Sequence, residues 1–304
     1  MKKYILKRLF QALICLIGVT VIIFSLTRIS GDPVLLMVSP EATKDDIETI
    51  RKVLGLDQPL YMQYWKCVSK AAVGDFGNSL RWNRSNLEIF MERFPNTILL
   101  AIASMCLAVF LGIPVGIISS IKVGKWFDNF GKIFALLGQA MPVFWLGIML
   151  VLLFAVWLQI LPTSGMGSWK HLIMPTVTLG WYFTSALTRL SRSAMLDVID
   201  AEYIKMARIV GVPEYLVITK YALKNAFIPI LTLGAVNFIA LLNGTVITET
   251  VFNWPGVGRL VVDAILTRDF PLVQTCVLIA SSLYIFTNLF VDVIYAYVDP
   301  RIRY

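Results

Sequence analysis

Charged residues are scarce in this sequence. Asp, Glu, Lys and Arg make up 15% of its 304 residues and hydrophobic residues make up 58%, whereas a soluble globular domain has about 25% and about 45–50%, respectively. This composition excludes an ordinary soluble enzyme. The charges that are present lean positive, with 27 Lys and Arg against 19 Asp and Glu. In so apolar a chain, this excess indicates orientation in a bilayer rather than binding to nucleic acid.

Cysteine and histidine are also rare. The four cysteines, Cys15, Cys67, Cys106 and Cys276, are far apart and three of them lie in apolar stretches, so we predict neither a disulfide framework nor a CxxC metal site. His171 is the single histidine, which excludes a His-rich zinc or haem site. We interpret it as a histidine at the membrane interface and expect no metal site.

The phosphate-binding pattern G-x-x-x-x-G-K-[ST] is absent as well. Gly124-Lys125 is followed by Trp126, and Ser119 stands where the first glycine should be. We therefore expect the chain to hold no cofactor and to have no phosphate-binding loop of its own. No intramembrane pair of ionisable residues lies beside a nucleophile or metal motif, so we do not expect an enzyme.

Long apolar runs are the main feature that the sequence does have. A bilayer core about 30 Å thick requires roughly 20 mostly apolar residues as helix. Six segments meet this requirement: 9–28, 97–121, 133–161, 172–190, 227–248 and 271–298. The predicted fold class is therefore all-α, a polytopic membrane protein with six transmembrane helices. The first run is too long for a signal peptide and no A-x-A-like site follows it, so we interpret it as an uncleaved anchor.

The distribution of positive charge predicts the orientation, because Lys and Arg concentrate in cytoplasmic segments. With the N-terminus inside, most basic residues are cytoplasmic, whereas the long outer segment 30–96 is nearly neutral. The cytoplasmic basic residues are Lys2, Lys3, Lys7, Arg8, Lys122, Lys125, Lys132, Arg189, Arg192, Lys205, Arg208, Lys220, Lys224, Arg301 and Arg303. We predict a multi-pass protein of a bacterial cytoplasmic membrane with both termini cytoplasmic. The predicted parts are an anchor helix (1–29), an extracytoplasmic cap (30–96) and a core with five spans (97–304) that includes a cytoplasmic loop (191–227).

The outer segment has the signals of a small folded cap. Thr43 begins a TKDD sequence typical of a helix N-terminus, and the helix is expected to end near Gly55. A second helix is predicted over about 60–72, ending before Gly74. Its aromatic face is predicted to dock onto the bundle, with contact to a partner as the alternative. The residues of that face are Tyr61, Tyr64, Trp65 and Val68.

The most informative stretch is DAEYIKMARIVGVPEYLVITKYALKNAFIP at 200–229, which is too polar to span a membrane. Its first part has helical periodicity, and Gly211 followed by Pro213 ends or turns that helix. We therefore predict a short helix, a turn and a second helix. Such an element suits docking into a groove on a cytoplasmic partner, with Glu202, Lys205 and Arg208 at the rim. A solvated loop is the alternative.

This stretch resembles the cytoplasmic loop of ABC importer permeases, in which an alanine precedes a glycine by four positions, as Ala207 and Gly211 do. In the peptide and nickel branch, the loop runs roughly Y-x-R-T-A-R-A-K-G and then H-x-L-R-N-A-x-I-P. This sequence has YIKMARIVG from Tyr203 and YALKNAFIP from Tyr221. The departures, mostly similar in size or charge, are Lys205 for Arg, Met206 for Thr, Val210 for Lys, Tyr221 for His and Lys224 for Arg. The resemblance implies an ATPase-coupling loop containing Tyr203, Lys205, Ala207, Arg208, Gly211 and Asn225.

Further motifs extend the resemblance over nearly the whole chain. They are Gly31-Asp32-Pro33, LGLDQPLYMQYW from Leu54, GDFGNS from Gly74, VFNWPGVGRLVVDAI from Val251, RDFPLVQ from Arg268 and NLFVDVIYAYVDPRIRY from Asn288. Together they are similar to permeases of dipeptide, oligopeptide, glutathione and nickel importers, and most similar to the glutathione type.

The resemblance implies the fold of a type I ABC importer permease and the import of short peptides. It also implies a second, homologous but non-identical permease, two cytoplasmic ATPase subunits and an extracytoplasmic substrate-binding protein. Import of nickel or a metal chelate stays open within the family. A secondary transporter driven by an ion gradient is the alternative from another class, against which the 200–229 loop and the absence of an evident inverted repeat argue.

Polar residues within the spans are candidates for the translocation path, because they are costly in hydrocarbon and usually face the bundle interior or a cavity. These candidates are Gln139, Asn237, Asn243, Thr245 and Glu249. For each of them an interhelical hydrogen bond is the alternative.

Three further features are singled out. Trp254, Pro255 and Gly256 form either an outer gate or a turn that anchors the tryptophan. Pro142 can kink the third span, either as a bend that lines the path or as a kink that serves packing. For Asp292 we favour an ion pair with Arg or Lys of a neighbouring span over a proton or cation site.

Overall fold

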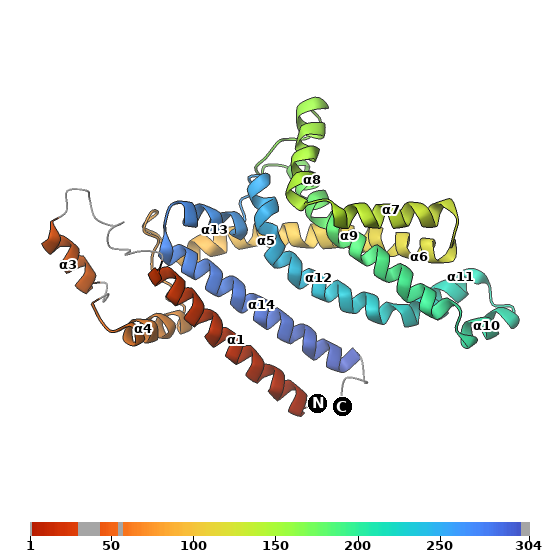
Figure 1. Ribbon diagram of the computed structural model, residues 1–304, viewed down its shortest axis with the longest axis horizontal. Helices are drawn as coiled ribbons and strands as arrows, with labels where there is room; N and C mark the ends of the chain where they lie inside the picture. Colours follow the sequence, from red (N-terminus) through yellow and green to blue (C-terminus); the bar gives the residue numbers. More distant parts are fainter. Residues whose placement is uncertain (1, 30–42, 54–56, 299–304) are drawn as a thin grey trace. The chain divides into compact units, whose positions relative to one another are not determined.

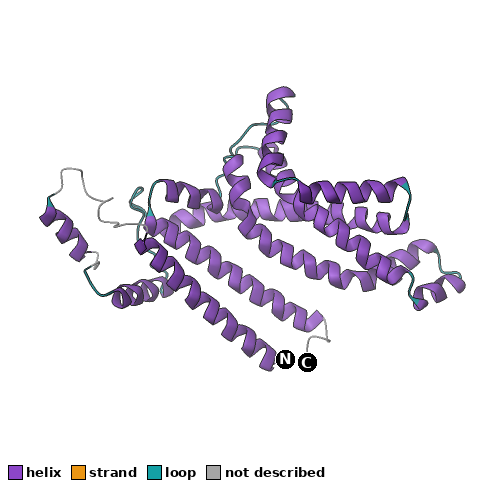
Figure 2. Ribbon diagram, viewed as in Figure 1, coloured by secondary structure: helices purple, strands orange, loops and turns teal. Residues whose placement is uncertain are grey.

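The computed structural model describes residues 2–29, 43–53 and 57–298, and within these ranges the regular structure is helical apart from an isolated antiparallel bridge between Asn78 and Ser85 (Figure 2). The predicted all-α fold class is confirmed. The predicted motifs Gly31-Asp32-Pro33 and DPRIRY, and the predicted helix stop at Gly55, lie outside the described residues.

The described helices belong to two compact units, each assembled from separate parts of the chain. The first unit consists of Met1–Pro95 and Gly256–Val293. Its helices are α1 (Lys2–Ile29), α3 (Lys44–Val53), α4 (Leu60–Ala72), the start of α5 (Asn86–Leu107), α13 (Val257–Leu266) and most of α14 (Phe270–Val298). In Figure 1, α1 and α14 lie side by side. Ile89 and Phe90 of α5 pack with Leu272 and Cys276 of α14 in its core.

The second unit consists of Asn96–Pro255 and Ile294–Tyr304. Its helices are the rest of α5, η1 (Ala108–Gly112), α6 (Ile113–Ile121), α7 (Trp126–Ala140), α8 (Val143–Leu150), η2 (Val151–Trp157), α9 (Trp169–Ile199), α10 (Glu202–Ile209), α11 (Glu214–Leu216), η3 (Val217–Ala222) and α12 (Leu223–Val251). Helix α9 packs against α6, α7, α8 and α12 and is the central helix of this unit. The domain boundaries predicted from sequence were set by membrane topology. The division into two units depends on contacts within the chain and does not test topology, so those boundaries stay predictions.

Four stretches of helix in the described part of the chain are long and apolar enough to cross a membrane. They are Ile5–Ile29, Asn86–Ile121, Glu214–Leu241 and Phe270–Val293. They overlap the first, second, fifth and sixth predicted spans. The fourth predicted span, 172–190, lies within α9, which has 31 residues but is not among these apolar stretches. The count of six therefore remains a prediction.

The third predicted span, 133–161, is a bent pair of helices rather than one uninterrupted helix. Helix α7 meets the continuous helix of α8 and η2 at an angle of 104°. Pro142 lies at the break with extended backbone (φ −61°, ψ 136°), and it has no N–H to continue the hydrogen-bond ladder. The predicted kink at Pro142 is confirmed, and the expectation of a single continuous span is corrected.

Glycines allow close backbone packing against α9. A Cβ atom on Gly112 would lie 2.7 Å from the carbonyl oxygen of Thr184, and one on Gly116 would lie 2.5 Å from that of Thr188. These spacings leave no room for a larger side chain, so η1 and α6 contact α9 backbone to backbone. Small residues at helix contacts are typical of membrane bundles, where dispersion and close approach drive association.

The two helices predicted in the outer segment are present as α3 and α4. On the predicted aromatic face of α4, Tyr64 docks onto α1: its Oη lies 2.8 Å from Thr20 Oγ1, and its ring centroid lies 5.5 Å from that of Phe24. Tyr61 and Trp65 remain 72% and 71% exposed. The docking prediction is therefore confirmed for part of the face only.

Candidate functional site

The loop that follows α9 folds as a compact element with its own short helices. Helix α9 ends at Ile199, α10 follows, and α11 and η3 lead directly into α12 (Figure 1). The predicted succession of short helix, turn and second helix is thus present. The second helix begins with a π-helical stretch, η3, before α12 continues in regular α geometry.

Gly211 ends α10 in a left-handed conformation, with φ +84°. The Gly211 N–H donates to the carbonyl of Arg208 and the Val212 N–H donates to that of Ala207, both at 3.0 Å. These two bonds form a Schellman motif, which satisfies the last carbonyls of a helix and requires a residue that tolerates positive φ. The glycine predicted to end the helix therefore sets the direction of the turn.

One face of α10 is fixed against the core of the second unit. Ile204 is fully buried and Ala207 is 8% exposed, and both belong to a cluster with Met195 of α9 and Val217 and Ala222 of η3. The small side chain of Ala207 fits where the helix approaches this cluster. The loop is consequently a packed extension of α9 and α12 rather than a solvated linker.

A polar link joins α10 to α12. Asn225 Nδ2 donates to Tyr203 Oη at 2.9 Å and to the carbonyl of Tyr221 at 3.2 Å. The structure thus brings together Tyr203 and Asn225, two residues of the predicted coupling set that are 22 positions apart.

Four charged residues of the loop form two ion pairs. Arg208 donates through two nitrogens to the Glu214 carboxylate at 2.8 and 3.2 Å, and Lys205 Nζ lies 2.9 Å from Glu202 Oε1. Beside these exposed charges, the loop also presents apolar side chains outward, a feature that the sequence analysis missed. We call this the α10 surface; its residues and exposed fractions are Met206 (60%), Ile209 (79%), Val210 (75%) and Tyr215 (66%). Ile209 and Val210, two apolar residues directly before Gly211, are the feature of the sequence from which this surface could have been predicted.

The candidate path residues occupy different environments. Asn237 and Thr245 on α12 are 8% and 1% exposed, and Asn237 Nδ2 and Thr245 Oγ1 have no hydrogen-bond partner in the described part of the chain. Gln139 on α7 is half-buried. The side chain of Asn243 lies outside what the structure describes. No hydrogen bond between described residues joins these side chains into one cluster.

Glu249, the remaining path candidate, is fully buried and makes an interhelical contact. Its Oε1 accepts a hydrogen bond from Thr97 Oγ1 on α5 at 2.7 Å. Within this chain it therefore links α12 to α5, which is the alternative stated for every path candidate.

The candidate outer gate is a tightly held turn. Trp254 is 1% exposed; its Nε1 donates to the carbonyl of Asn96 at 3.0 Å, and Asn96 Nδ2 donates to the carbonyl of Pro255 at 2.9 Å. Asn253 has a positive φ of 51°. In this conformation the tryptophan is anchored by α5, as in the turn interpretation.

A buried ion cluster at the start of α7 was not anticipated. Asp128 is fully buried and accepts bonds from Arg192 Nε at 2.7 Å and Arg192 Nη2 at 3.2 Å, and from the Gly124 N–H at 3.0 Å. Lys132 Nζ lies 2.7 Å from the same carboxylate. The cluster ties the α6–α7 connection to α9. From the sequence, only the pairing of Asp128 with Lys132 could have been predicted, by its i, i+4 spacing. Arg192 is 64 positions away, and no local pattern connects it to Asp128.

Two single residues have structural partners. Arg8 Nε lies 3.3 Å from Asp292 Oδ2, joining α1 to α14, so the predicted ion pair of Asp292 is confirmed. His171 Nδ1 accepts a hydrogen bond from the Ser168 N–H at the start of α9, at 3.1 Å. The described residues contain no group of three or more His, Cys, Asp or Glu placed to hold a metal ion.

Residues 112–304 match the family described as "Binding-protein-dependent transport system inner membrane component", and residues 1–101 match the corresponding N-terminal family. Over 305 aligned positions and 100% of both chains, the sequence is 42% identical to the glutathione transport system permease protein GsiC of Salmonella paratyphi A and 41% identical to GsiC of Escherichia coli K12.

Two solved structures share the fold at low sequence identity. An inward-facing MetNI methionine ABC transporter aligns with a TM-score of 0.59 and 15% identity over 70% of this chain and 97% of that chain. An amino acid ABC transporter crystallised with histidines aligns with a TM-score of 0.57 and 12% identity over 69% and 94%, respectively.

Proposed function

Because the chain belongs to the family of binding-protein-dependent transport system inner membrane components, we propose that it is the permease subunit of an ABC importer for short peptides of the glutathione type. The observation that carries the proposal is the 41–42% identity, over the full length of both chains, to permeases named for glutathione transport. The long apolar helices are those of a multi-pass membrane protein.

The energy source lies in other subunits. The chain lacks the phosphate-binding pattern, so two cytoplasmic ATPase subunits are proposed to bind ATP and Mg²⁺, while this chain binds neither and catalyses no reaction. A second, non-identical permease is proposed to complete the path, and an extracytoplasmic binding protein is proposed to deliver the cargo. The excess of basic residues in the predicted inner segments supports cytoplasmic termini.

The α10 surface is proposed to dock into a groove on an ATPase subunit. Burying its exposed apolar side chains in such a groove stabilises the complex by about 25 cal/mol per Å² of apolar area removed from water. The paired charges of Lys205–Glu202 and Arg208–Glu214 form a polar rim. Since α10 packs rigidly against α9 and α12, closure of the ATPases would move these helices as one body and switch the access of the path.

Asn237 and Thr245 are proposed to face the path in the assembled importer. A buried polar atom without a partner costs about 1–3 kcal/mol, and both residues have such atoms within the described chain. Water, cargo or the second permease would supply the missing partners. Gln139, Asn243 and Glu249 remain candidates, and Trp254, Pro255 and Gly256 are proposed to close the outer end of the path as a fixed turn.

The coupling proposal is tested by charging the α10 surface. In Ile209→Glu with Val210→Glu, the permease should insert into the membrane but lose ATPase subunits during purification, because burying two carboxylates in an apolar groove is costly. Val73→Glu is the matched control, since Val73 is 81% exposed on a different element. Normal retention of the ATPases by the double variant would contradict docking at this surface.

The cargo proposal is tested with the partner binding protein. Purified without added ligand, the binding protein is expected to retain glutathione or a short peptide. In vesicles that contain the assembled importer, radiolabelled glutathione should be taken up only when ATP is supplied on the side of the ATPase subunits. Vanadate should abolish this uptake. Retention of a metal or metal chelate instead would replace the peptide assignment, and uptake driven by an ion gradient without ATP would overturn the importer class.

A further inference from the structure

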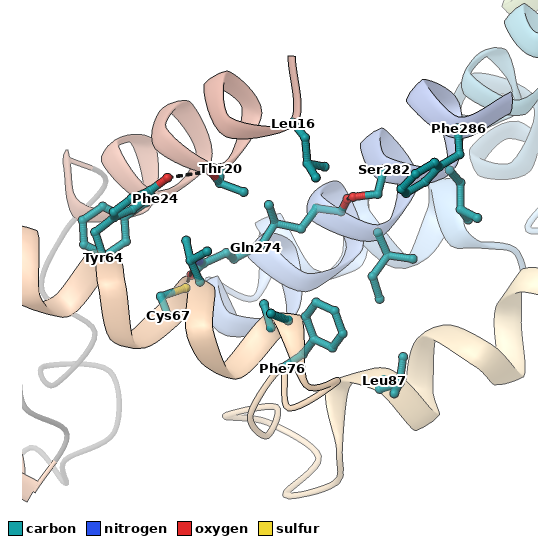
Figure 3. Close-up of a pocket in the computed structure, with 16 residues that line it drawn as sticks. Leu16, Thr20, Phe24, Tyr64, Cys67, Phe76, Leu87, Gln274, Ser282 and Phe286 are labelled. Atoms are coloured by element: carbon teal, nitrogen blue, oxygen red, sulfur yellow. Dashed lines mark hydrogen bonds between the residues drawn. The ribbon is translucent and has the colours of Figure 1, made fainter. Parts of the chain in front are cut away.

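A groove in the first unit has no role in the coupling site or the path candidates. It has a volume of about 390 Å³, within the range of about 300–1,000 Å³ typical of ligand pockets. Helices α1, α4 and α14 form its walls, and Phe76 and Leu87 close one end (Figure 3). We call it the α1–α4–α14 groove.

The lining of this groove is almost wholly apolar. The apolar residues are Leu16, Phe24, Val68, Ala71, Ala72, Phe76, Leu87, Leu278, Ile279, Leu283 and Phe286. The polar side chains that line it already have hydrogen-bond partners within the protein: Thr20 with Tyr64 at 2.8 Å, Gln274 Nε2 with Cys67 Sγ at 2.9 Å, and Ser282 with the carbonyl of Leu278 at 2.7 Å. A peptide in this groove would lose its hydrogen bonds to water without replacement, which costs free energy. The occupant that fits is hydrocarbon.

The groove is continuous with exposed apolar surface on α1 and α14, the two membrane-length helices of this unit. Phe286 lines it and is also 57% exposed, and on α1 the neighbouring Ile17 is 51% exposed. Only 11% of the most apolar window of either α1 or α14 is buried. Hydrocarbon chains of the membrane can therefore reach the groove sideways from between these two helices, without crossing water.

A cation lies at the end of α1 beyond the groove. The guanidinium of Arg28 lies 5.2 Å from the centre of the Phe24 ring, one helical turn along from a residue that lines the groove. Phosphate is the acidic group that a membrane places next to an apolar chain, and arginine is well suited to bind it. The charge and the apolar wall therefore match the two parts of one molecule.

We propose that the α1–α4–α14 groove binds an acyl chain of a membrane phospholipid, with the phosphate at the Arg28 end. The bound chain fills the space between α4 and the two membrane helices, so it extends the contact that Tyr64 makes with α1. Helix α4 is not among the stretches that are long and apolar enough to span a membrane, and it turns Tyr64, Cys67, Val68 and Ala71 toward the groove, so contact between hydrocarbon and these residues marks occupation of the groove.

The experiment uses the assembled importer in nanodiscs that contain phosphatidylglycerol with a photoreactive diazirine in its acyl chain. After illumination, mass spectrometry should find lipid adducts on the groove-lining residues of α4, in addition to adducts on α1 and α14. These residues of α4 are Tyr64, Cys67, Val68, Ala71 and Ala72. In Ala71→Trp, adducts on α4 should fall at least about tenfold, because expelling roughly two methylene groups from apolar contact changes affinity by that factor.

Ser69→Trp is the matched control, because Ser69 is exposed on the same helix and does not line the groove; its labelling should equal that of the native chain. Leu283→Trp fills the groove from α14 and serves as the second variant should Ala71→Trp fail to assemble. Labelling of α1 and α14 without α4 in the native importer would overturn the proposal. A benzoylphenylalanine at position 68 that cross-links to another subunit, rather than to lipid, would do so as well.

Discussion

Single residues in the 200–229 loop act through backbone conformation and burial more than through charge. Gly211 adopts φ +84° although open space surrounds the position of a Cβ atom, so its requirement is conformational. Ala207 has a requirement for small size instead, because it is nearly buried in the cluster beneath α10. The charged neighbours Lys205 and Arg208 pair within the loop, which leaves the exposed apolar side chains to distinguish this surface.

Replacing Gly211 tests the conformational requirement. Gly211→Val is expected to weaken coupling, because a residue with a Cβ atom in the left-handed region costs about 1–2 kcal/mol and the turn that positions the α10 surface then relaxes. Gly211→Asn should retain most uptake, since asparagine tolerates this region. Insertion is measured by membrane fractionation and coupling by ATP-dependent uptake. Equal uptake by the valine and asparagine variants would contradict the role of the turn.

Cys67 provides a pH-dependent readout on α4. Burial raises the pKa of the Cys67 thiol, while the hydrogen bond donated by Gln274 opposes this by favouring the thiolate. A raised pKa means less thiolate at neutral pH, so maleimide should react severalfold more slowly with Cys67 than with a cysteine at the exposed position of Val73, and the rate should rise at a higher pH. Gln274→Leu removes the opposing bond and should slow labelling further. Identical pH profiles for the two sites would contradict this environment.

At the level of helices, polar contacts between elements hold positions that the apolar pattern leaves free. Asp128 ties α7 to α9, Glu249 ties α12 to α5 through Thr97, and Trp254 ties the end of the α12 turn to α5 through Asn96. Apolar surfaces of membrane helices slide past one another at small cost, because lipid tails are as apolar as leucine. Directional bonds at these points fix the register.

The Asp128 cluster should dominate the stability of the α7–α9 contact. Arg192→Leu is expected to destabilise the purified protein by about 3 kcal/mol, the lower end for breaking a buried ion pair, because Lys132 still contacts the carboxylate. Lys132→Met should cost at most about 1 kcal/mol, as Lys132 is half exposed and exposed pairs are weak. Denaturant unfolding in detergent measures both. Asp128→Leu combined with Arg192→Leu should recover part of the loss, and a strictly additive result would contradict a coupled pair.

For the whole chain, charge distribution predicts orientation. Basic residues gather in the predicted inner segments and the outer segment 30–96 is nearly neutral. A fluorescent protein fused to the C-terminus should therefore fluoresce, whereas alkaline phosphatase at the same position should be inactive. Active phosphatase at the C-terminus, or external labelling of a cysteine placed at position 205, would reverse the predicted topology.

Much of the local structure was predictable from sequence. The bounds of α4 agree with the predicted helix over 60–72, Gly211 ends α10, and Pro142 separates α7 from α8. These features depend on residues a few positions apart: an apolar period, a proline without an N–H, and a glycine that accepts positive φ. The same local chemistry carried the family motifs, because they are contiguous runs of the chain.

Contacts between distant residues could not be obtained in this way. The partners of Asp128, Glu249 and Trp254 on other helices lie 64, 152 and 158 positions away, and no period or spacing encodes such distances. The outward face of α10 likewise depends on which residues the core has already buried, and the α1–α4–α14 groove depends on three helices from both ends of the chain meeting. Sequence specifies which segments are helical and apolar, since that depends on each segment alone. Burial and pairing depend on the neighbours that the fold supplies, so they became known only once the helices were packed.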